Sequence, residues 1–168
     1  MVKQASEYDI PSIEEILSDA VNWMSAQGLQ NQWNESNIKW SSLSNFYHIN
    51  DFYIAYHDGL PAACMALIDY DPVYWPDIPK GKSLYLHKLA VKRTFAGIGL
   101  SKELIDFSKD FARSRCMNTI HLNCNRHRDK LRALYEKEGF ICAGEKTFPE
   151  NYDTALYVCS IKDTCSVL

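Results

Sequence analysis

An apolar strand that leads through a glycine turn into a helix is the feature that most restricts the fold of this 168-residue chain. In the segment LYLHKLAVKRTFAGIGLSKELI, residues 84–105, apolar residues alternate at Leu84 and Leu86 and resume one position late at Leu89 and Val91. A period of two predicts a strand, and the delay predicts that its phase slips near Lys88. The segment is therefore expected to form strand, turn and helix in that order.

The turn that follows this strand contains Gly97 and Gly99, and the helix is expected to begin at Leu100. Glycine permits close approach to the backbone, and the first N–H groups of a helix have no acceptor within the helix. Because the helix dipole also favours negative charge at this end, the sequence predicts a phosphate-binding corner. Neither GxxxxGK[ST] nor GxGxxG occurs, so a P-loop is excluded and a dinucleotide-binding fingerprint is unsupported.

Hydrophobic periodicity and turn residues predict the rest of the fold. The Asp58-Gly59 pair predicts a hairpin, and a helix between two strands makes those strands parallel. We expect an α/β (α+β) fold with a mixed, mostly antiparallel sheet of about seven strands, a central parallel pair and about four helices. The expected strands are 2–6, 51–56, 62–70, 84–91, 119–123, 140–143 and 154–161, and the expected helices are 9–28, 35–46, 100–115 and 126–139.

Length and composition favour one compact domain over residues 1–168, with 46% hydrophobic residues to fill its core. The six cysteines form no CxxC pair, so we expect reduced thiols and no metal site. No apolar run reaches the roughly 18 residues of a membrane span, and the N-terminus carries acids where a signal peptide needs an apolar segment. We therefore expect a cytoplasmic protein that does not bind membranes.

The net charge of −3 conceals two halves of opposite sign. Residues 1–80 contain three lysines against eleven acids, a net charge of −8, whereas residues 81–168 contain fifteen basic residues against ten acids, a net charge of +5. The basic half carries the glycine turn and suits a polyanionic ligand, and the acidic half would attract a cation such as an amine.

Two motifs of the chain resemble the GNAT superfamily of acyl-CoA N-acyltransferases. The strand ending LAV and the turn that follows are similar to the family's pyrophosphate-binding segment, whose pattern is R/Q-x-x-G-x-G/A at the start of a long helix. Ala96 stands where the family usually has Arg or Gln, and Ser101 stands where it has Gly or Ala. The later segment ALYEKEGF resembles the family's helix end Y-x-x-x-G-F.

This resemblance implies a GNAT fold, in which the central parallel strands splay apart, and an N-acetyltransferase that uses acetyl-CoA (coenzyme A). Arg128 stands where the family often has an asparagine that contacts the pantetheine arm, with Asn123 nearby. The residues that the resemblance assigns to the cofactor are Leu89, Ala90, Val91, Ala96, Gly97, Ile98, Gly99, Leu100, Ser101, Lys102, Asn123, Arg128 and Tyr135.

Acetyl transfer needs a neutral amine, a stabilised oxyanion and a proton for the departing thiolate. A backbone N–H of the strand around residues 89–91 would meet the oxyanion, and Tyr135 resembles the family's general acid. His87 has suitable chemistry for a general base, and Tyr85 shares its strand face and would relay through water. Aromatic side chains favour Trp33, Tyr70 and Tyr85 as acceptor-binding residues.

Two other functions remain open at this stage. The departures at Ala96 and Ser101 favour a non-catalytic sensor or regulatory module that binds CoA or acyl-CoA. The basic helix after Arg126 would suit a nucleic acid, but the overall acidity and the neighbouring acids argue against that partner. The expected partner is a small-molecule or peptide amine; its identity and the oligomeric state, a homodimer included, are not decided by the sequence.

Overall fold

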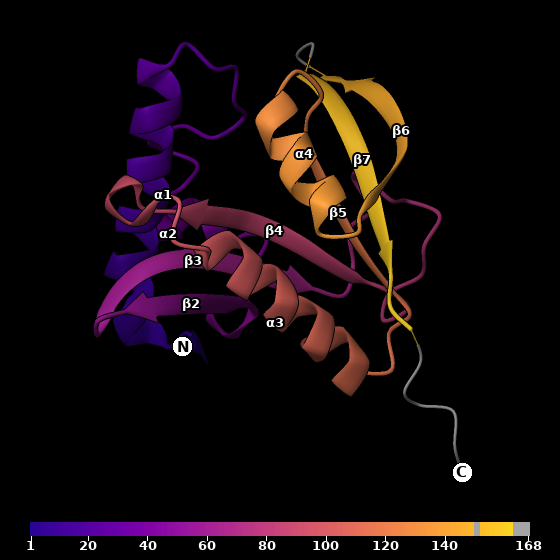
Figure 1. Ribbon diagram of the computed structural model, residues 1–168, viewed down its shortest axis with the longest axis horizontal. Helices are drawn as coiled ribbons and strands as arrows, with labels where there is room; N and C mark the ends of the chain where they lie inside the picture. Colours follow the sequence, from indigo (N-terminus) through magenta and orange to yellow (C-terminus); the bar gives the residue numbers. More distant parts are fainter. Residues whose placement is uncertain (150–151, 163–168) are drawn as a thin grey trace. The chain divides into compact units, whose positions relative to one another are not determined.

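The computed structural model describes residues 1–149 and 152–162. Within these residues one mixed sheet has the strand order β1-β2-β3-β4-β5-β7-β6, in which β4 and β5 are parallel (Figure 1). The strands are β1 Val2–Gln4, β2 Phe52–His57, β3 Leu60–Ile68, β4 Leu84–Val91, β5 Thr119–Asn125, β6 Ile141–Phe148 and β7 Tyr152–Ser160. The helices are α1 Ile10–Ala26, α2 Trp40–Leu43, α3 Leu100–Ser114 and α4 Asp129–Lys137. The expected fold class is confirmed.

The chain divides into two compact units of internal contacts. The first unit contains Met1–Leu67 and Lys88–Leu104, and the second contains Ile68–His87 and the residues from Ile105 onward. The boundary passes through β4 and α3, so each unit holds part of both elements. A single domain over the whole chain stays a prediction.

In the first unit α1 packs its apolar face on β2, β3 and the end of β4 (Figure 1). Ile13 and Leu17 of α1 are fully buried against Phe52 and Ile54 of β2, and Ala90 of β4 belongs to the same cluster. The Asp58-Gly59 turn has left-handed φ angles of 49° and 76°, as a two-residue hairpin requires. The core of this unit therefore fixes the second half of β4.

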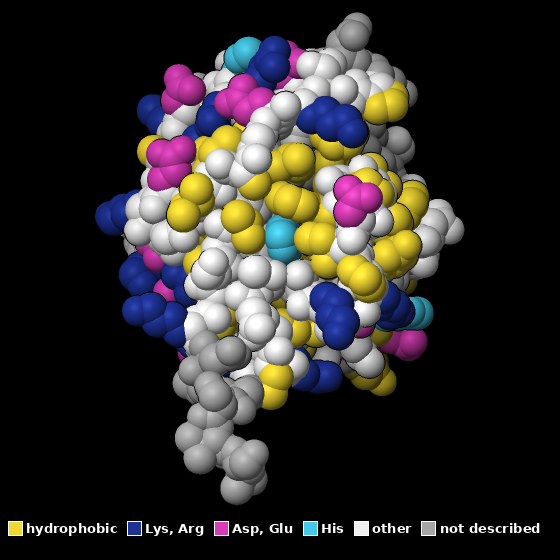
Figure 2. Space-filling model, turned by 90° about the vertical axis from the view of Figure 1, so that its right-hand side faces the viewer, with side chains coloured by type: hydrophobic (Ala, Val, Ile, Leu, Met, Phe, Trp, Pro, Cys, Tyr) yellow, Lys and Arg dark blue, Asp and Glu magenta, His cyan; other side chains and the backbone are white. Residues whose placement is uncertain are grey.

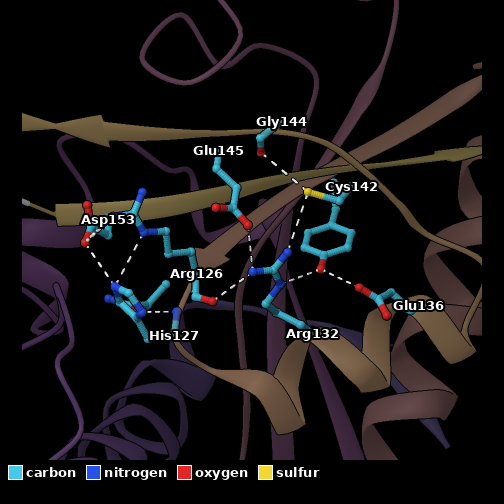
Figure 3. A network of polar contacts seen from close by, with 10 residues as sticks. Arg126, His127, Arg132, Glu136, Cys142, Gly144, Glu145 and Asp153 are labelled. Carbon is cyan, nitrogen blue, oxygen red and sulfur yellow. Dashed lines mark hydrogen bonds and ion pairs between the residues drawn. The ribbon is translucent and has the colours of Figure 1, made fainter.

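In the second unit Arg132 ties α4 to the strands beside it (Figure 3). Its guanidinium donates to the Tyr157 hydroxyl at 2.9 Å and to Glu145 at 2.8 Å, and the Tyr157 hydroxyl donates to Glu136 at 2.8 Å. These hydrogen bonds raise the pKa of Arg132 above its ordinary value, so the side chain stays charged. The network holds the helix that carries Tyr135 in a defined orientation.

Several expected elements differ in their bounds from those observed. The expected helix 35–46 shrinks to the four residues of α2. The last two strands extend further, because β6 continues through the expected loop to Phe148 and pairs with β7 as far as Phe148↔Tyr152. The first strand ends at Gln4, and α1 begins after Asp9, whose carboxylate accepts from Ser6 and leaves α1 uncapped.

Four cysteines carry free thiols, as expected: Cys64, Cys124, Cys142 and Cys159. The expectation is wrong for Cys116, which is disulfide-bonded. Cys165 lies outside the described residues. No helix among the described residues combines the length and apolar character needed to cross a bilayer.

Candidate active site

The glycine turn of the first unit leaves three backbone donors exposed. Gly97 and Gly99 have left-handed φ angles of 83° and 94°, and a Cβ added at either position would meet no atom within 4 Å. The N–H groups of Gly97, Ile98 and Gly99 donate to no acceptor among the described residues. The side chain of Ile98 is 51% exposed, so the turn is open to solvent.

This turn fits a diphosphate by its backbone, since free N–H groups at the start of a 15-residue helix attract anions. Ala96 adds no side-chain donor to it. Leu100 is buried and anchors the helix start, whereas Ser101 and Lys102 lie on its first turn with half-buried and exposed side chains. The chain therefore supplies the backbone part of the site that the sequence predicts.

The other residues assigned to a cofactor lie on β4 and in the second unit. Ala90 is buried in the core of the first unit, and its neighbours Leu89 and Val91 are half-buried. The ladder between β4 and β5 contains only the pairs Leu84↔Ile120 and Tyr85↔His121. In the second unit Asn123 lies on β5 and Arg128 precedes α4, both half-buried.

Tyr135 lies near the end of α4 and is buried. Its ring packs on Phe140 and Tyr157, with centroids 6.0 and 6.1 Å away. Burial raises the pKa of Tyr135 well above its ordinary value, so the phenol is protonated at any physiological pH. The helix ends beyond it at Gly139, whose φ of 89° is the left-handed conformation expected at a glycine stop.

His87 of β4 contacts Asp71 in the second unit, and both side chains are little exposed. The His87 Nε2 lies 3.0 Å from Oδ2 of Asp71, and the two side chains are 15% and 6% exposed. The other carboxylate oxygen of Asp71 accepts the Tyr74 N–H at 3.1 Å, which fixes the carboxylate. Since a carboxylate can only accept, Nε2 is the donor in this contact and carries a proton.

Tyr85 and His121 form a stacked pair in the same unit, with ring centroids 5.4 Å apart, and Trp75 packs on His121 at 4.2 Å. Burial lowers the pKa of His121 to about 4, so its imidazole is neutral. The Tyr85 hydroxyl and Nδ1 of His121 are buried without a hydrogen-bond partner among the described residues. Such atoms usually bind an ordered water.

Figure 2 shows one histidine side chain surrounded by hydrophobic side chains on the face in view. Apolar surroundings favour the neutral, proton-accepting form of an imidazole. Tyr85 itself is fully buried, so it does not present its ring to solvent. Tyr70, by contrast, is 44% exposed.

Trp33 of the first unit is partly buried against the core cluster, and the Lys88 ammonium lies 5.0 Å from its ring centroid. Lys88 has a left-handed φ of 54° within β4, at the point where the sequence predicts a slip of phase. Burial lowers the pKa of Lys88 to about 8. A strained backbone and a desolvated ammonium thus occur at one residue.

The lowered pKa of Lys88 should make the free energy of unfolding depend on pH. The unfolded chain holds the Lys88 proton up to its ordinary pKa of about 10.4, so between pH 8 and pH 10 the unfolded state binds more protons and stability rises with pH. We expect Lys88→Met to raise the free energy of unfolding at pH 7 by about 1–2 kcal/mol, and by less at pH 9.5. Urea unfolding at both pH values measures this.

Lys39→Met is the matched control, because the Lys39 ammonium is about half exposed and lies 3.5 Å from Glu14. This control should change stability by less than about 0.5 kcal/mol at either pH. A gain from Lys88→Met that is equal at both pH values would mean that lost charge is not its cause.

The acids of α1 do not form a free anionic surface for an amine. Glu14 accepts the Trp40 N–H at 2.7 Å, and Glu15 lies 2.8 Å from the Lys92 ammonium. Asp19 accepts the Arg93 N–H at 2.7 Å. An open groove of about 410 Å³ beside these acids contains none of the predicted site residues. These three acids of α1 therefore bind neighbouring segments of the first unit.

The sequence did not reveal that Asp71 contacts His87, nor that burial lowers the pKa of Lys88. Asp71 is 5% exposed and contacts His87. For Lys88 the sequence did give one signal, the slip in the alternation of apolar residues within residues 84–91. His121 is buried.

The chain is similar to known proteins in sequence and in fold. A model of the acetyltransferase (GNAT) family matches residues 12–140. The uncharacterized N-acetyltransferase YesJ of Bacillus subtilis (strain 168) is 28% identical over 145 residues, which cover 79% of this chain and 76% of YesJ. A GNAT-family acetyltransferase structure from Listeria monocytogenes has a TM-score of 0.71 at 23% identity and covers 95% of this chain and 94% of its own.

A second structural relative is N-acetylglutamate synthase from Neisseria gonorrhoeae, solved in complex with coenzyme A and N-acetyl-glutamate. Its TM-score is 0.69 at 20% identity, and the alignment covers 96% of this chain but 35% of the synthase. The structural likenesses show the fold, and the family model covers most of the chain. The chain belongs to the acetyltransferase (GNAT) family, and it is an acetyltransferase.

Proposed function

We propose that this protein transfers the acetyl group of acetyl-CoA to a primary amine of a small molecule or peptide by direct attack on the thioester. The observation that carries the proposal is the open turn at Gly97 and Gly99, whose free N–H groups precede α3. Acetyl-CoA supplies an acetyl group that is activated as a thioester. The amides of the turn would hold its diphosphate, and Ser101 and Lys102 would extend that contact.

The strand around Leu89, Ala90 and Val91 would orient the thioester carbonyl by its backbone. Half-buried side chains at Leu89 and Val91 flank the buried Ala90, so this segment is fixed by the core of its unit. A fixed N–H that faces a developing oxyanion stabilises the transition state without reorganisation. Asn123 and Arg128 of the second unit would contact the pantetheine arm.

His87 would accept the proton of the attacking amine through Nδ1, with Asp71 holding the ring by its Nε2–H. The 3.0 Å contact between His87 and Asp71 and the low exposure of both side chains support this assignment. A carboxylate that holds one imidazole nitrogen fixes the tautomer and stabilises the imidazolium that forms. Asp71 is then a positioning residue that acts through His87.

A water bound to the Tyr85 hydroxyl and to Nδ1 of His121 would extend the route for the proton, since both atoms are buried and lack partners among the described residues. Tyr135 would donate its proton to the departing sulfur, because its raised pKa keeps the phenol protonated. Trp33 and the exposed Tyr70 would contact the acceptor.

Two measurements on the full chain test this function. Titration calorimetry with acetyl-CoA should show saturable binding, and CoA release in the presence of a panel of primary amines should identify at least one acceptor. Absence of binding would refute the proposal. Binding without turnover across the panel would favour a sensor of CoA or acyl-CoA.

We expect His87→Ala to lower kcat/KM by about 10-fold to 100-fold at neutral pH and by less at alkaline pH. The loss shrinks because a growing share of the acceptor amine is already neutral and needs no base. Asp71→Asn should cause an intermediate loss, since asparagine keeps the oxygen that accepts the Tyr74 N–H but removes the charge. Initial rates from pH 6 to pH 9.5 measure both effects.

Asp69→Asn is the matched control, because Asp69 is in the same loop and faces the exposed Lys80 at 3.9 Å. It should leave the pH profile unchanged. If His87→Ala lowered the rate by the same factor at every pH, His87 would have a structural role and would not be the base.

A further inference from the structure

Lys88 is unusual in the first unit in two independent respects. It is a non-glycine residue with a left-handed φ of 54° inside a strand, a conformation that costs about 1–2 kcal/mol for an L-residue. Its ammonium lies over the Trp33 ring at 5.0 Å and forms no ion pair with a carboxylate among the described residues. Strain of this kind persists where surrounding structure holds it, and it is frequent at functional sites.

The groups around Lys88 do not neutralise its charge. Cys64 of β3 donates its thiol to the Lys88 carbonyl at 3.8 Å, and burial raises the pKa of that thiol to about 12, so it is not an anion. The carboxylates of Glu14, Glu15 and Asp19 are occupied by partners of their own. The first unit thus presents a partly desolvated cation beside a tryptophan face and offers it no counterion.

A cation placed in this way is suited to an anion that arrives with a ligand. A lysine ammonium is a compact point charge with three donors, and it fits a single carboxylate. Charge-assisted hydrogen bonds are stronger where water is partly excluded. The Trp33 face would at the same time cover an apolar part of the ligand.

We propose that Lys88 and Trp33 form the subsite for a carboxylate of the acceptor, so that the substrate is an amino acid or a small amino-acid-like amine. This inference rests on the proposed transfer of an acetyl group to an amine. Lys88 pairs with the carboxylate, Trp33 packs on the carbon skeleton, and the amine of the same molecule is the nucleophile. The acidic residues of α1 contribute nothing to recognition.

The test uses the proteinogenic amino acids, each beside its C-terminal amide, as acceptors for the full-length protein. The amide keeps the amine and removes the negative charge. For the best acid and its amide we expect Lys88→Met to lower kcat/KM by about 10-fold to 100-fold for the acid and by less than about threefold for the amide. Lys88→Arg should restore part of the preference, because it keeps the charge.

Comparing each ratio of acid to amide between wild type and variant cancels intrinsic differences in amine reactivity. Lys39→Met, the paired and half-exposed lysine, should leave the ratio unchanged. An equal loss for acid and amide in Lys88→Met would overturn the carboxylate subsite.

Calorimetry with acetyl-CoA separates this proposal from the proposed function. If wild type binds acetyl-CoA but acetylates no amino acid, the carboxylate subsite is refuted and acetyl transfer to another amine stands. If Lys88→Met weakens acetyl-CoA binding and spares the ratio of acid to amide, Lys88 serves a cofactor phosphate and the subsite is again refuted. If wild type binds no acetyl-CoA, both proposals fail.

Discussion

Replacing Tyr135 with phenylalanine is expected to lower turnover by about 100-fold or more, while the affinity for acetyl-CoA changes by less than about threefold. The substitution removes one hydroxyl and keeps the ring that packs on Phe140 and Tyr157. The hydroxyl forms no hydrogen bond with the described residues, so its loss leaves no structural partner unsatisfied. If Tyr135 is the proposed general acid, the variant therefore loses the proton donor for the leaving thiolate and little else.

Steady-state kinetics together with calorimetry measure the two parts of this prediction. Tyr157→Phe is the matched control: it removes a hydroxyl from the neighbouring buried ring, where the group joins Arg132 to Glu136. If the control lowered turnover as strongly as Tyr135→Phe, the cause would be a displaced α4. If Tyr135→Phe kept wild-type turnover, the phenol would not be the acid.

Local pattern predicted most of the sheet and the glycine turn. The alternation in residues 84–91, the Asp58-Gly59 turn and the glycine stop at Gly139 each depend on neighbouring residues alone. The slip in alternation even marked the residue that adopts a positive φ, Lys88. Periodicity cannot report what a strained side chain contacts, so the Trp33 face above the ammonium emerged only from the structure.

The second expected helix failed because side chains there compete for the backbone. The Asn34 carboxamide oxygen accepts the N–H groups of Ser36 and Asn37, and Asn37 in turn accepts the Asn34 N–H. Such local bonds replace those of a helix. The aromatic spacing that suggested a helix has another explanation, because Trp40 and Tyr47 both pack edgewise on Phe52 of β2.

The contact between His87 and Asp71 was harder to predict than the fold. Asp71 follows β3 and His87 lies near the middle of β4, so their 3.0 Å contact depends on how the intervening loop folds back. The loop contains Asp69, Asp71 and Asp77, and burial distinguishes Asp71 from Asp69, whose side chain is 44% exposed. Strand β6 was underestimated for a related reason, since its mostly exposed residues lack alternation and its pairing with β7 defines it.

Gly99→Glu is expected to weaken acetyl-CoA binding by about 100-fold or more. A Cβ at this position meets no neighbour, so the new side chain fits sterically, but its carboxylate would lie at the start of α3 among the free amides. It would repel the diphosphate and compete for the same donors. The φ of 94° adds backbone strain of about 1–2 kcal/mol.

Two variants separate charge from strain in this prediction. Gly99→Ala carries the strain without the charge and should weaken binding by less than about tenfold. Gly59→Glu carries both at the hairpin turn, where φ is 76° and the space is equally open, and should leave affinity unchanged. Titration calorimetry on all three, with melting curves to confirm folding, decides the point. Since the free amides of this turn carry the whole assignment of the phosphate site, wild-type affinity in Gly99→Glu would place the diphosphate elsewhere.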